Sequence, residues 1–175
     1  MALSDMPAFD AEGRVRVVVE SPRGSAVKFK YDAGLGAFTL SRPLIDGVTY
    51  PYDWGFVPST RGPDGDPIDA MILWDRASYP GMVIPCRVIG LLKAEQNSKL
   101  HRGKRERNDR ILAVPAMAPK LAAITDVRDL SPRLKQELEA FFAAAVALED
   151  KGLKLLGWSG AARATAMIRQ SAAGG

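Results

Sequence analysis

The first two thirds of the chain predict short strands, because β-branched and aromatic residues occur there in brief runs separated by turn residues. Glycine and proline clusters such as RGPDGDP at 61–67 punctuate these runs. The strands are expected at residues 14–20, 26–31, 37–42, 69–74, 83–93 and 111–114. This part of the chain therefore favours a small curled sheet or a barrel.

A helical pattern replaces the strand pattern from residue 131 onward. Ser131 is a suitable N-cap, Pro132 suits the first helical position, and Gly152 suits the end. Apolar residues recur at spacings of three and four, which predicts one buried stripe along a helix. The stripe consists of Leu134, Leu138, Phe141, Phe142, Ala145 and Leu148. A weaker helix is expected over 161–171. Strands followed by helices predict an α+β fold.

Composition is that of one globular domain spanning residues 1–175, with 47% hydrophobic and 25% charged residues. Cys86 is the only cysteine, so an internal disulfide is excluded. The first residues lack the pattern of a secretion signal, and we expect a cytoplasmic location. The apolar run at 140–148 is far shorter than the ~20 residues of a membrane helix, so we expect no membrane association.

The net charge of +4 is a local feature. The segment 98–110 holds six basic and two acidic residues, which leaves the rest of the chain neutral. A general nucleic-acid-binding surface is therefore not indicated.

The segment DGDPID at 64–69 contains the residues with the clearest chemical potential. Asp64, Asp66 and Asp69 occur within six residues where a turn enters an apolar strand, and alternation along the strand would let them converge. Three close carboxylates need a cation, a proton or surrounding basic groups. If a metal ion is bound, all-oxygen ligands favour Mg²⁺ or Mn²⁺. Two simpler interpretations stay open, since aspartates in a turn often bond their own backbone or form a solvated loop.

A family resemblance sharpens this hypothesis. Residues 49–73 read TYPYDWGFVPSTRGPDGDPIDAMIL and closely resemble the signature region of family I soluble inorganic pyrophosphatases. The similarity runs in consistent order from about residue 14 to 158. It implies a five-stranded OB-type β-barrel with flanking helices, commonly in a homo-oligomer. It also implies Mg²⁺-dependent hydrolysis of pyrophosphate to two phosphates by water that the metal activates, with Mn²⁺ as a second option.

The resemblance carries roles onto matching positions of this chain. Asp64 and Asp69 match metal ligands, and Asp66 matches the carboxylate that handles the proton of the attacking water at the metal. Substrate-binding positions are matched by Glu20, Lys28, Arg42 and Tyr50, with Trp54 and Arg110 as further candidates. Lys28 and Arg42 are expected to hold phosphate oxygens.

Several positions depart from the family pattern. Lys30 replaces a glutamate that helps to hold a metal, Trp54 replaces a tyrosine, and Arg110 replaces a lysine. Arg110 can hold phosphate with two parallel bonds, whereas a lysine offers a point charge. Other family residues, an acidic pair, an aspartate and a helical Tyr-Lys pair, appear here as Gln96-Asn97, Asn108 and Ala145-Val146. We therefore expect fewer or weaker metal sites.

Two neighbouring acids offer replacements for the missing ligands. Glu95 and Asp109 each lie one residue away from an altered position, so they would reach the metal only if the chain path shifts. For Asp109 this requires a β-bulge.

A basic insertion at about 98–107 lies between the altered positions. One hypothesis makes it a lid for a phosphate-bearing substrate, using Lys99, Arg102, Lys104, Arg105 or Arg107. The alternative is a solvated charge run. Two other functions stay open for the whole chain: a hydrolase of another phosphoanhydride, or a non-catalytic module that binds phosphate or nucleic acid. The loop has no aromatic residue for base stacking, which disfavours nucleic acid.

Overall fold

The computed structural model describes residues 2–173. The strands in that part of the chain are β1 (Val15–Ser21), β2 (Val27–Asp32), β3 (Ala37–Pro43), β4 (Asp53–Val57), β5 (Ile68–Ile72), β6 (Val83–Asn97), β7 (Arg105–Arg107), β8 (Arg110–Pro115) and β9 (Lys154–Gly160). The helices are α1 (Pro132–Ala145) and α2 (Ala161–Ala173), with short 3₁₀ turns at Leu3–Asp5, Pro119–Leu121 and Val127–Asp129.

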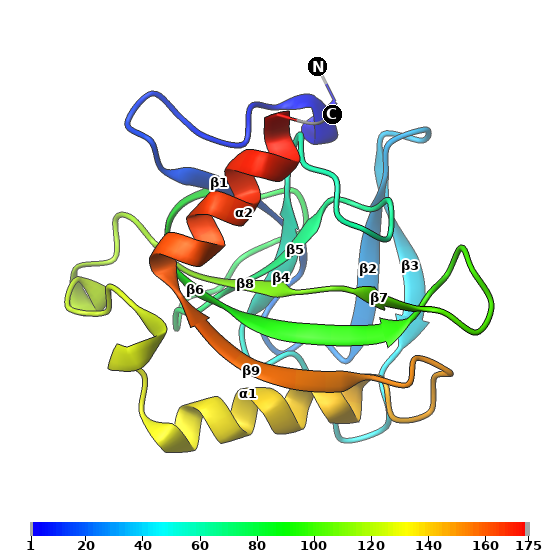
Figure 1. Ribbon diagram of the computed structural model, residues 1–175. Coiled ribbons are helices and arrows are strands. Elements are labelled where there is room, and N and C mark those ends of the chain that lie inside the picture. The colour runs from blue at the N-terminus through cyan, green and yellow to red at the C-terminus, as the bar shows by residue number, and fades with distance from the viewer. Residues whose placement is uncertain (1, 174–175) are drawn as a thin grey trace.

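Five strands close into an uneven barrel. They follow the order β1-β4-β5-β8-β6, and the pairing of β1 with β6 closes the ring. All neighbours are antiparallel except β5 and β8. Strands β7 and β9 both pair with β6, while β2 and β3 form a separate hairpin beside the barrel (Figure 1). The predicted α+β fold with a five-stranded barrel is confirmed.

The barrel strands bury both of their faces, and each face belongs to a different core cluster. In β5, Ala70 and Ile72 pack with α2, whereas Met71 points to the opposite cluster with α1. Alternate residues of β8 divide in the same way, which explains its unbroken apolar sequence. The two helices consequently cover different sides of the barrel (Figure 1).

Helix α1 begins as the sequence predicts and ends earlier. The Ser131 hydroxyl accepts the backbone N–H of Leu134 at 3.1 Å, which confirms the N-cap. Phe141 and Phe142 are buried against the barrel, but the last helical residue is Ala145. Leu148 therefore falls outside the helix and is 82% exposed, so its assignment to the buried stripe was wrong. The weaker helix predicted at 161–171 is confirmed as α2.

Three strands, β4, β7 and β9, were not predicted from the sequence. Strand β4 contains Gly55, and glycine usually weakens a strand. Here a glycine is required because a Cβ atom would lie 1.8 Å from the carbonyl oxygen of Val18 in β1. The basic insertion also has more structure than expected, since its end forms β7 and pairs with β6.

None of the helices described in residues 2–173 is long and apolar enough to cross a membrane.

Candidate active site

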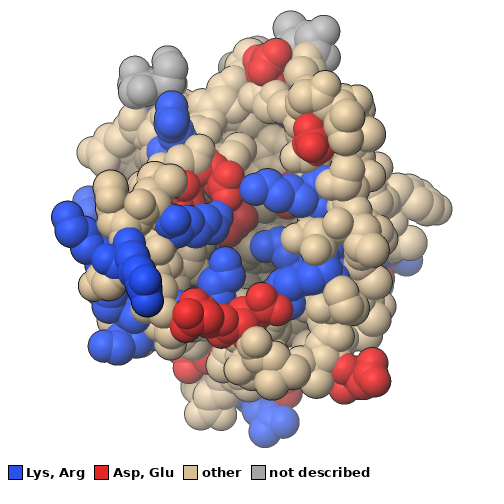
Figure 2. Space-filling model, turned by 90° about the vertical axis from the view of Figure 1, so that its right-hand side faces the viewer, with Lys and Arg blue, Asp and Glu red and all other residues tan. Residues whose placement is uncertain are grey.

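A charged cavity of about 470 Å³ opens between the β2–β3 hairpin, the loop before β5 and the end of α1. Figure 2 shows it as a hollow rimmed by basic and acidic side chains. The basic lining residues are Lys28, Lys30, Arg42, Lys99, Arg110 and Lys151. The acidic lining residues are Glu20, Asp64, Asp66, Asp69 and Glu149. The lining is close to neutral overall, so the separation of the two signs within the pocket matters more than their sum.

A tight turn places Asp64 and Asp66 at the pocket. Gly65 adopts φ of +83°, a left-handed conformation that favours glycine. The Gly65 N–H donates to the carbonyl of Gly62 at 3.0 Å, and the Asp66 N–H donates to Asp64 Oδ1 at 3.2 Å. The aspartate-to-backbone bond that the sequence left open as a simpler interpretation is therefore present, together with a position at the cavity.

Two lysine side chains hold these carboxylates. The Lys99 ammonium group lies 2.6 Å from Asp66 Oδ2 and 3.2 Å from Asp64 Oδ2. Lys30 donates to both Asp66 oxygens at 3.2 Å. Burial raises the pKa of Asp66, but the hydrogen bonds and charges of Lys99 and Lys30 outweigh burial and hold the pKa below its usual value.

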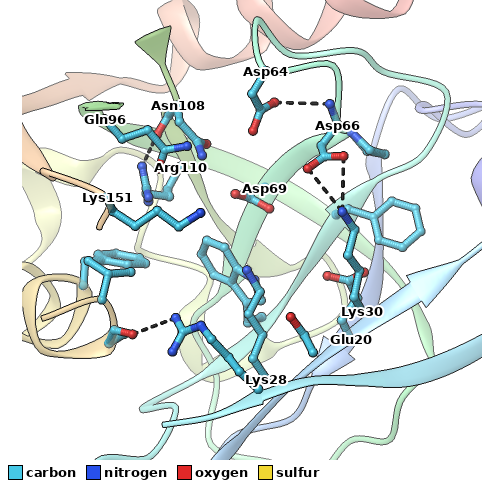
Figure 3. Close-up of a pocket in the computed structure, with 18 of the residues that line it drawn as sticks. Glu20, Lys28, Lys30, Asp64, Asp66, Asp69, Gln96, Asn108, Arg110 and Lys151 are labelled. Carbon is cyan, nitrogen blue, oxygen red and sulfur yellow. Dashed lines mark hydrogen bonds and ion pairs between the residues drawn. The ribbon is translucent and has the colours of Figure 1, made fainter. Parts of the chain in front are cut away.

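Asp69 faces the same cavity from β5. It pairs in register with Phe56 of β4, and no hydrogen bond or ion pair to its carboxylate occurs within residues 2–173. Burial raises the pKa of Asp69, opposed by the charges of Lys28 and Arg110. Asp64, Asp66 and Asp69 together are called the acidic wall below (Figure 3).

Glu20 reaches the cavity from an irregular point of β1. The register against β4 shifts between Val19 and Ser21, so a bulge turns the Glu20 side chain toward β2. Its Oε1 accepts the Tyr31 N–H at 2.7 Å. Burial, with the nearby charge of Asp69, raises the pKa of Glu20 to about 7 despite that hydrogen bond.

Lys28 and Arg42 are direct cross-strand partners in the β2–β3 hairpin. Like charges at such positions repel, so the pair is unfavourable without an anion nearby. Arg42 Nη2 also donates to the carbonyl of Ala145 at 2.7 Å, at the end of α1 where a cation is favoured. Its Nη1 lies 3.7 Å from Glu149.

Arg110 is buried deeper than the other cations. Its guanidinium group lies over the Phe142 ring at 5.6 Å, and one nitrogen donates to the carbonyl of Asn108. Burial lowers its pKa. Within the described residues, three buried donors at this pocket lack an acceptor: Arg110 Nε, Trp54 Nε1 and Gln96 Nε2. Unsatisfied buried donors on one side of a pocket indicate affinity for an anion.

Lys151 was not found by sequence reasoning. It follows α1 in an irregular segment, and its side chain points into the pocket beside Arg110 (Figure 3). Burial and the charges of Lys99 and Lys28 lower the pKa of Lys151, while Glu149 opposes them. The one sequence feature that could have indicated Lys151 is its position as a basic residue shortly after the end of the predicted helix. We call Lys28, Arg42, Arg110 and Lys151 the basic wall.

The two aromatic candidates are also at the cavity, mainly as packing residues. Tyr50 is 4% exposed and its ring lies 5.2 Å from that of Phe141. Trp54 makes an edge contact with Phe142. Burial raises the pKa of the Tyr50 hydroxyl, so it stays protonated and can donate to an anion.

The structure places the two alternative acids outside the cavity. Glu95 pairs with Arg105, and Asp109 pairs with Arg107 at 2.8 Å. Asp109 also accepts the N–H of Ala94 at 2.9 Å. Successive residues of β6 face opposite sides, so Gln96 lines the pocket while Glu95 does not. In the two-residue link between β7 and β8, Asn108 lines the pocket and Asp109 does not. The chain path that would have brought Glu95 and Asp109 inward does not occur.

The pocket suits a hard divalent cation by donor type, since its acidic wall offers only carboxylate oxygens. The convergence of three acids is incomplete, however. Within residues 2–173, no three His, Cys, Asp or Glu side chains form a ready metal cluster, and two of the carboxylates hold ammonium groups. A metal would fit after these lysine contacts are exchanged.

Comparisons with known proteins agree with this architecture. Residues 17–174 match the sequence family described as inorganic pyrophosphatase. An inorganic pyrophosphatase from Nostoc sp. is 37% identical over 171 residues, covering 98% of this chain and 97% of the relative. A crystal structure of the inorganic pyrophosphatase from Thermus thermophilus matches with a TM-score of 0.90 at 36% identity, covering 99% of this chain and 98% of that one.

A further solved structure, the inorganic pyrophosphatase of Helicobacter pylori, matches with a TM-score of 0.84 at 30% identity and covers 92% of each chain. The five-stranded barrel and the charged pocket place this chain in a class of enzymes that have an OB-type barrel fold. The chain belongs to the inorganic pyrophosphatase family.

Proposed function

We propose that this protein hydrolyses inorganic pyrophosphate to two phosphates with the help of Mg²⁺, or of Mn²⁺ in its place. One observation carries the proposal. An acidic wall able to take a divalent cation faces a basic wall able to take phosphate oxygens, across a pocket of suitable size (Figure 3). Family membership supports the same reaction.

The basic wall would bind the substrate. Lys28 and Arg42 are cross-strand partners, and a phosphoryl group bound to both would relieve their repulsion. Arg110 offers a planar set of donors, held in place by Phe142. Lys151 adds a fourth cation in the region where Ala145 and Val146 stand in place of the family's Tyr-Lys pair.

The acidic wall would hold the metal and manage the proton. Asp64 and Asp69 are proposed as metal ligands, with Asp66 as a ligand that also receives a proton. A divalent cation at these oxygens supplies charge neutralisation and lowers the pKa of a bound water. Asp66 would take a proton from the attacking water as the water oxygen bonds to phosphorus, and the bridging P–O bond would break with its electron pair leaving on the departing phosphate. While Lys99 and Lys30 hold Asp66, its low pKa makes it a weak base.

A phosphate-release assay with pyrophosphate and Mg²⁺ tests this function. Asp66→Asn should lower kcat by about 10²–10⁴, the usual cost of losing a positioned proton acceptor. Wild-type protein that releases no phosphate, yet binds pyrophosphate, would instead support a non-catalytic phosphate-binding module. Faster release from tripolyphosphate or a nucleotide would favour another phosphoanhydride as substrate.

The proposal includes a cytoplasmic location and a homo-oligomer. The single thiol, Cys86, is buried and its pKa is raised by burial, which suits a stable reduced cysteine.

Met82 and Met117 are exposed beside an apolar groove of about 860 Å³, a surface that a second subunit could cover. Sedimentation of the purified chain measures the assembly, and a monomeric mass would contradict it.

A further inference from the structure

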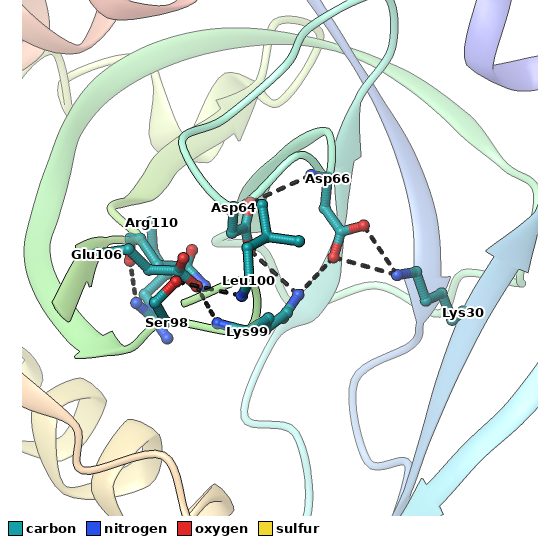
Figure 4. A network of polar contacts seen from close by, with 9 residues as sticks. Lys30, Asp64, Asp66, Ser98, Lys99, Leu100, Glu106 and Arg110 are labelled. Atoms are coloured by element: carbon teal, nitrogen blue, oxygen red, sulfur yellow. Dashed lines mark hydrogen bonds and ion pairs between the residues drawn. The ribbon is translucent and has the colours of Figure 1, made fainter. Parts of the chain in front are cut away.

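Lys99 occupies the oxygens that the acidic wall would offer to a metal. Its ammonium group bridges Asp66 Oδ2 at 2.6 Å and Asp64 Oδ2 at 3.2 Å, while Lys30 approaches Asp66 from the other side (Figure 4). The Lys99 side chain is 39% exposed and that of Asp64 only 8%. The Lys99 ammonium group therefore covers the Asp64 carboxylate, which has little contact with solvent.

The loop between β6 and β7 presents Lys99 in a defined position. Its backbone N–H donates to Glu106 Oε1 at 3.3 Å. The following N–H groups of Leu100 and His101 both donate to the Ser98 hydroxyl, at 3.2 and 3.1 Å. These bonds fold the start of the loop into a turn, and Figure 4 shows the Lys99 side chain reaching from it toward the aspartates.

Other basic residues of the insertion do not share this role. Arg105 and Arg107 pair with acids outside the cavity. Arg102 and Lys104 are exposed and do not line the pocket. Lys99 is thus the residue of this loop that joins the basic insertion to the acidic wall.

Resting on the proposed function, we propose that Lys99 is a tethered counter-ion that competes with the divalent cation for Asp64 and Asp66. A metal ion on the oxygens that Lys99 contacts would lie close to its ammonium group, where the two positive charges repel. Metal binding would therefore displace Lys99 from both carboxylates. The affinity of this protein for its metal is set in part by a lysine that its own loop supplies.

Titration with Mn²⁺ in the absence of substrate tests the competition without any turnover. The decrease of the free-ion signal in electron paramagnetic resonance measures how much Mn²⁺ is bound. Lys99→Met should bind Mn²⁺ about tenfold more tightly than wild type, as expected for removal of a partly exposed ion pair and of one nearby positive charge. Lys99→Arg keeps the charge and should stay close to wild type. Lys104→Met removes the same charge from the same loop without a carboxylate contact, and should change the affinity less than twofold.

Two results would overturn the proposal, and they differ in what else they affect. If Lys99→Met binds Mn²⁺ no more tightly than wild type while Asp64→Asn binds it more weakly, Lys99 does not compete although the metal site stands. If Asp64→Asn and Asp66→Asn both bind Mn²⁺ as tightly as wild type, the proposed metal site itself is lost. Circular dichroism of each variant confirms that the fold is unchanged.

Discussion

The acidic and basic walls of the pocket are held in opposite ways. Asp64 and Asp66 are already paired with lysines from other elements, so their charge is neutralised within the protein. The cations of the basic wall are anchored by aromatic and backbone contacts or face one another, as Lys28 and Arg42 do. Among the residues that the structure describes, only Glu149 approaches this wall as a close acid partner, at 3.7 Å from Arg42.

This difference separates the two binding events that hydrolysis requires. An anion entering the basic wall would relieve repulsion and satisfy free donors, so it needs no prior rearrangement. A cation entering the acidic wall must first displace an ammonium group. We therefore expect phosphate to bind without metal, whereas metal binding carries the cost of broken ion pairs.

After Asp66→Asn, the largest effect is expected from Asp69→Asn, because Asp69 is the carboxylate of the acidic wall that no lysine contacts within residues 2–173. Its loss should lower kcat/KM for pyrophosphate by about 10³, comparable to removing one preorganised electrostatic group from an active site. Phosphate release measures the change. Asp46→Asn is the matched control, since Asp46 is exposed and lines neither the pocket nor the apolar groove. A drop below tenfold would remove Asp69 from the metal site.

Glu20→Gln should change how stability depends on pH. The pKa of Glu20 is raised from 4.5 in the unfolded chain to about 7 in the fold, so the native state binds the proton more tightly. Wild-type unfolding free energy should therefore fall as pH rises through 4.5 to 7, by on the order of 3 kcal/mol from this group. A glutamine side chain cannot ionise, so the variant lacks that decline. Urea unfolding at pH 5 and pH 8 without metal tests this, and parallel pH profiles would contradict it.

Lys151→Met should weaken the basic wall specifically. Losing one charge-assisted hydrogen bond would reduce the affinity for inorganic phosphate about tenfold, because such bonds contribute roughly 1.5 kcal/mol. Calorimetry in the presence of a chelator measures the anion alone. Lys154→Met, an exposed lysine three residues away, serves as the control. Equal phosphate binding by both variants would exclude Lys151 from the subsite.

The smallest effect concerns the lid hypothesis. Arg102 and Lys104 do not line the cavity, so replacing both with methionine should alter KM for pyrophosphate by less than twofold. Steady-state kinetics at fixed Mg²⁺ provide the measurement. A fivefold or larger rise would show that the loop closes over the substrate well beyond Lys99.

Local sequence was enough to predict the elements and residues whose environment depends on near neighbours. The strands around β1, β5 and β8 follow from runs of β-branched residues, and α1 starts where Ser131 and Pro132 predict it. The turn at 64–69 was also predictable, since Gly65 permits the left-handed conformation that it needs. Family resemblance then pointed to Lys28 and Arg42.

Tertiary structure alone decided which charges meet. Lys99 reaches Asp64 across 35 positions of sequence, and Lys151 enters the pocket from a segment without periodicity. The register of β6 places Gln96 rather than Glu95 at the pocket, and the link between β7 and β8 places Asn108 there rather than Asp109. Residue spacing encodes short-range geometry, but side chains from separate elements are brought together by strand pairing and loop closure. Those depend on the packing of the whole barrel rather than on any single stretch of residues.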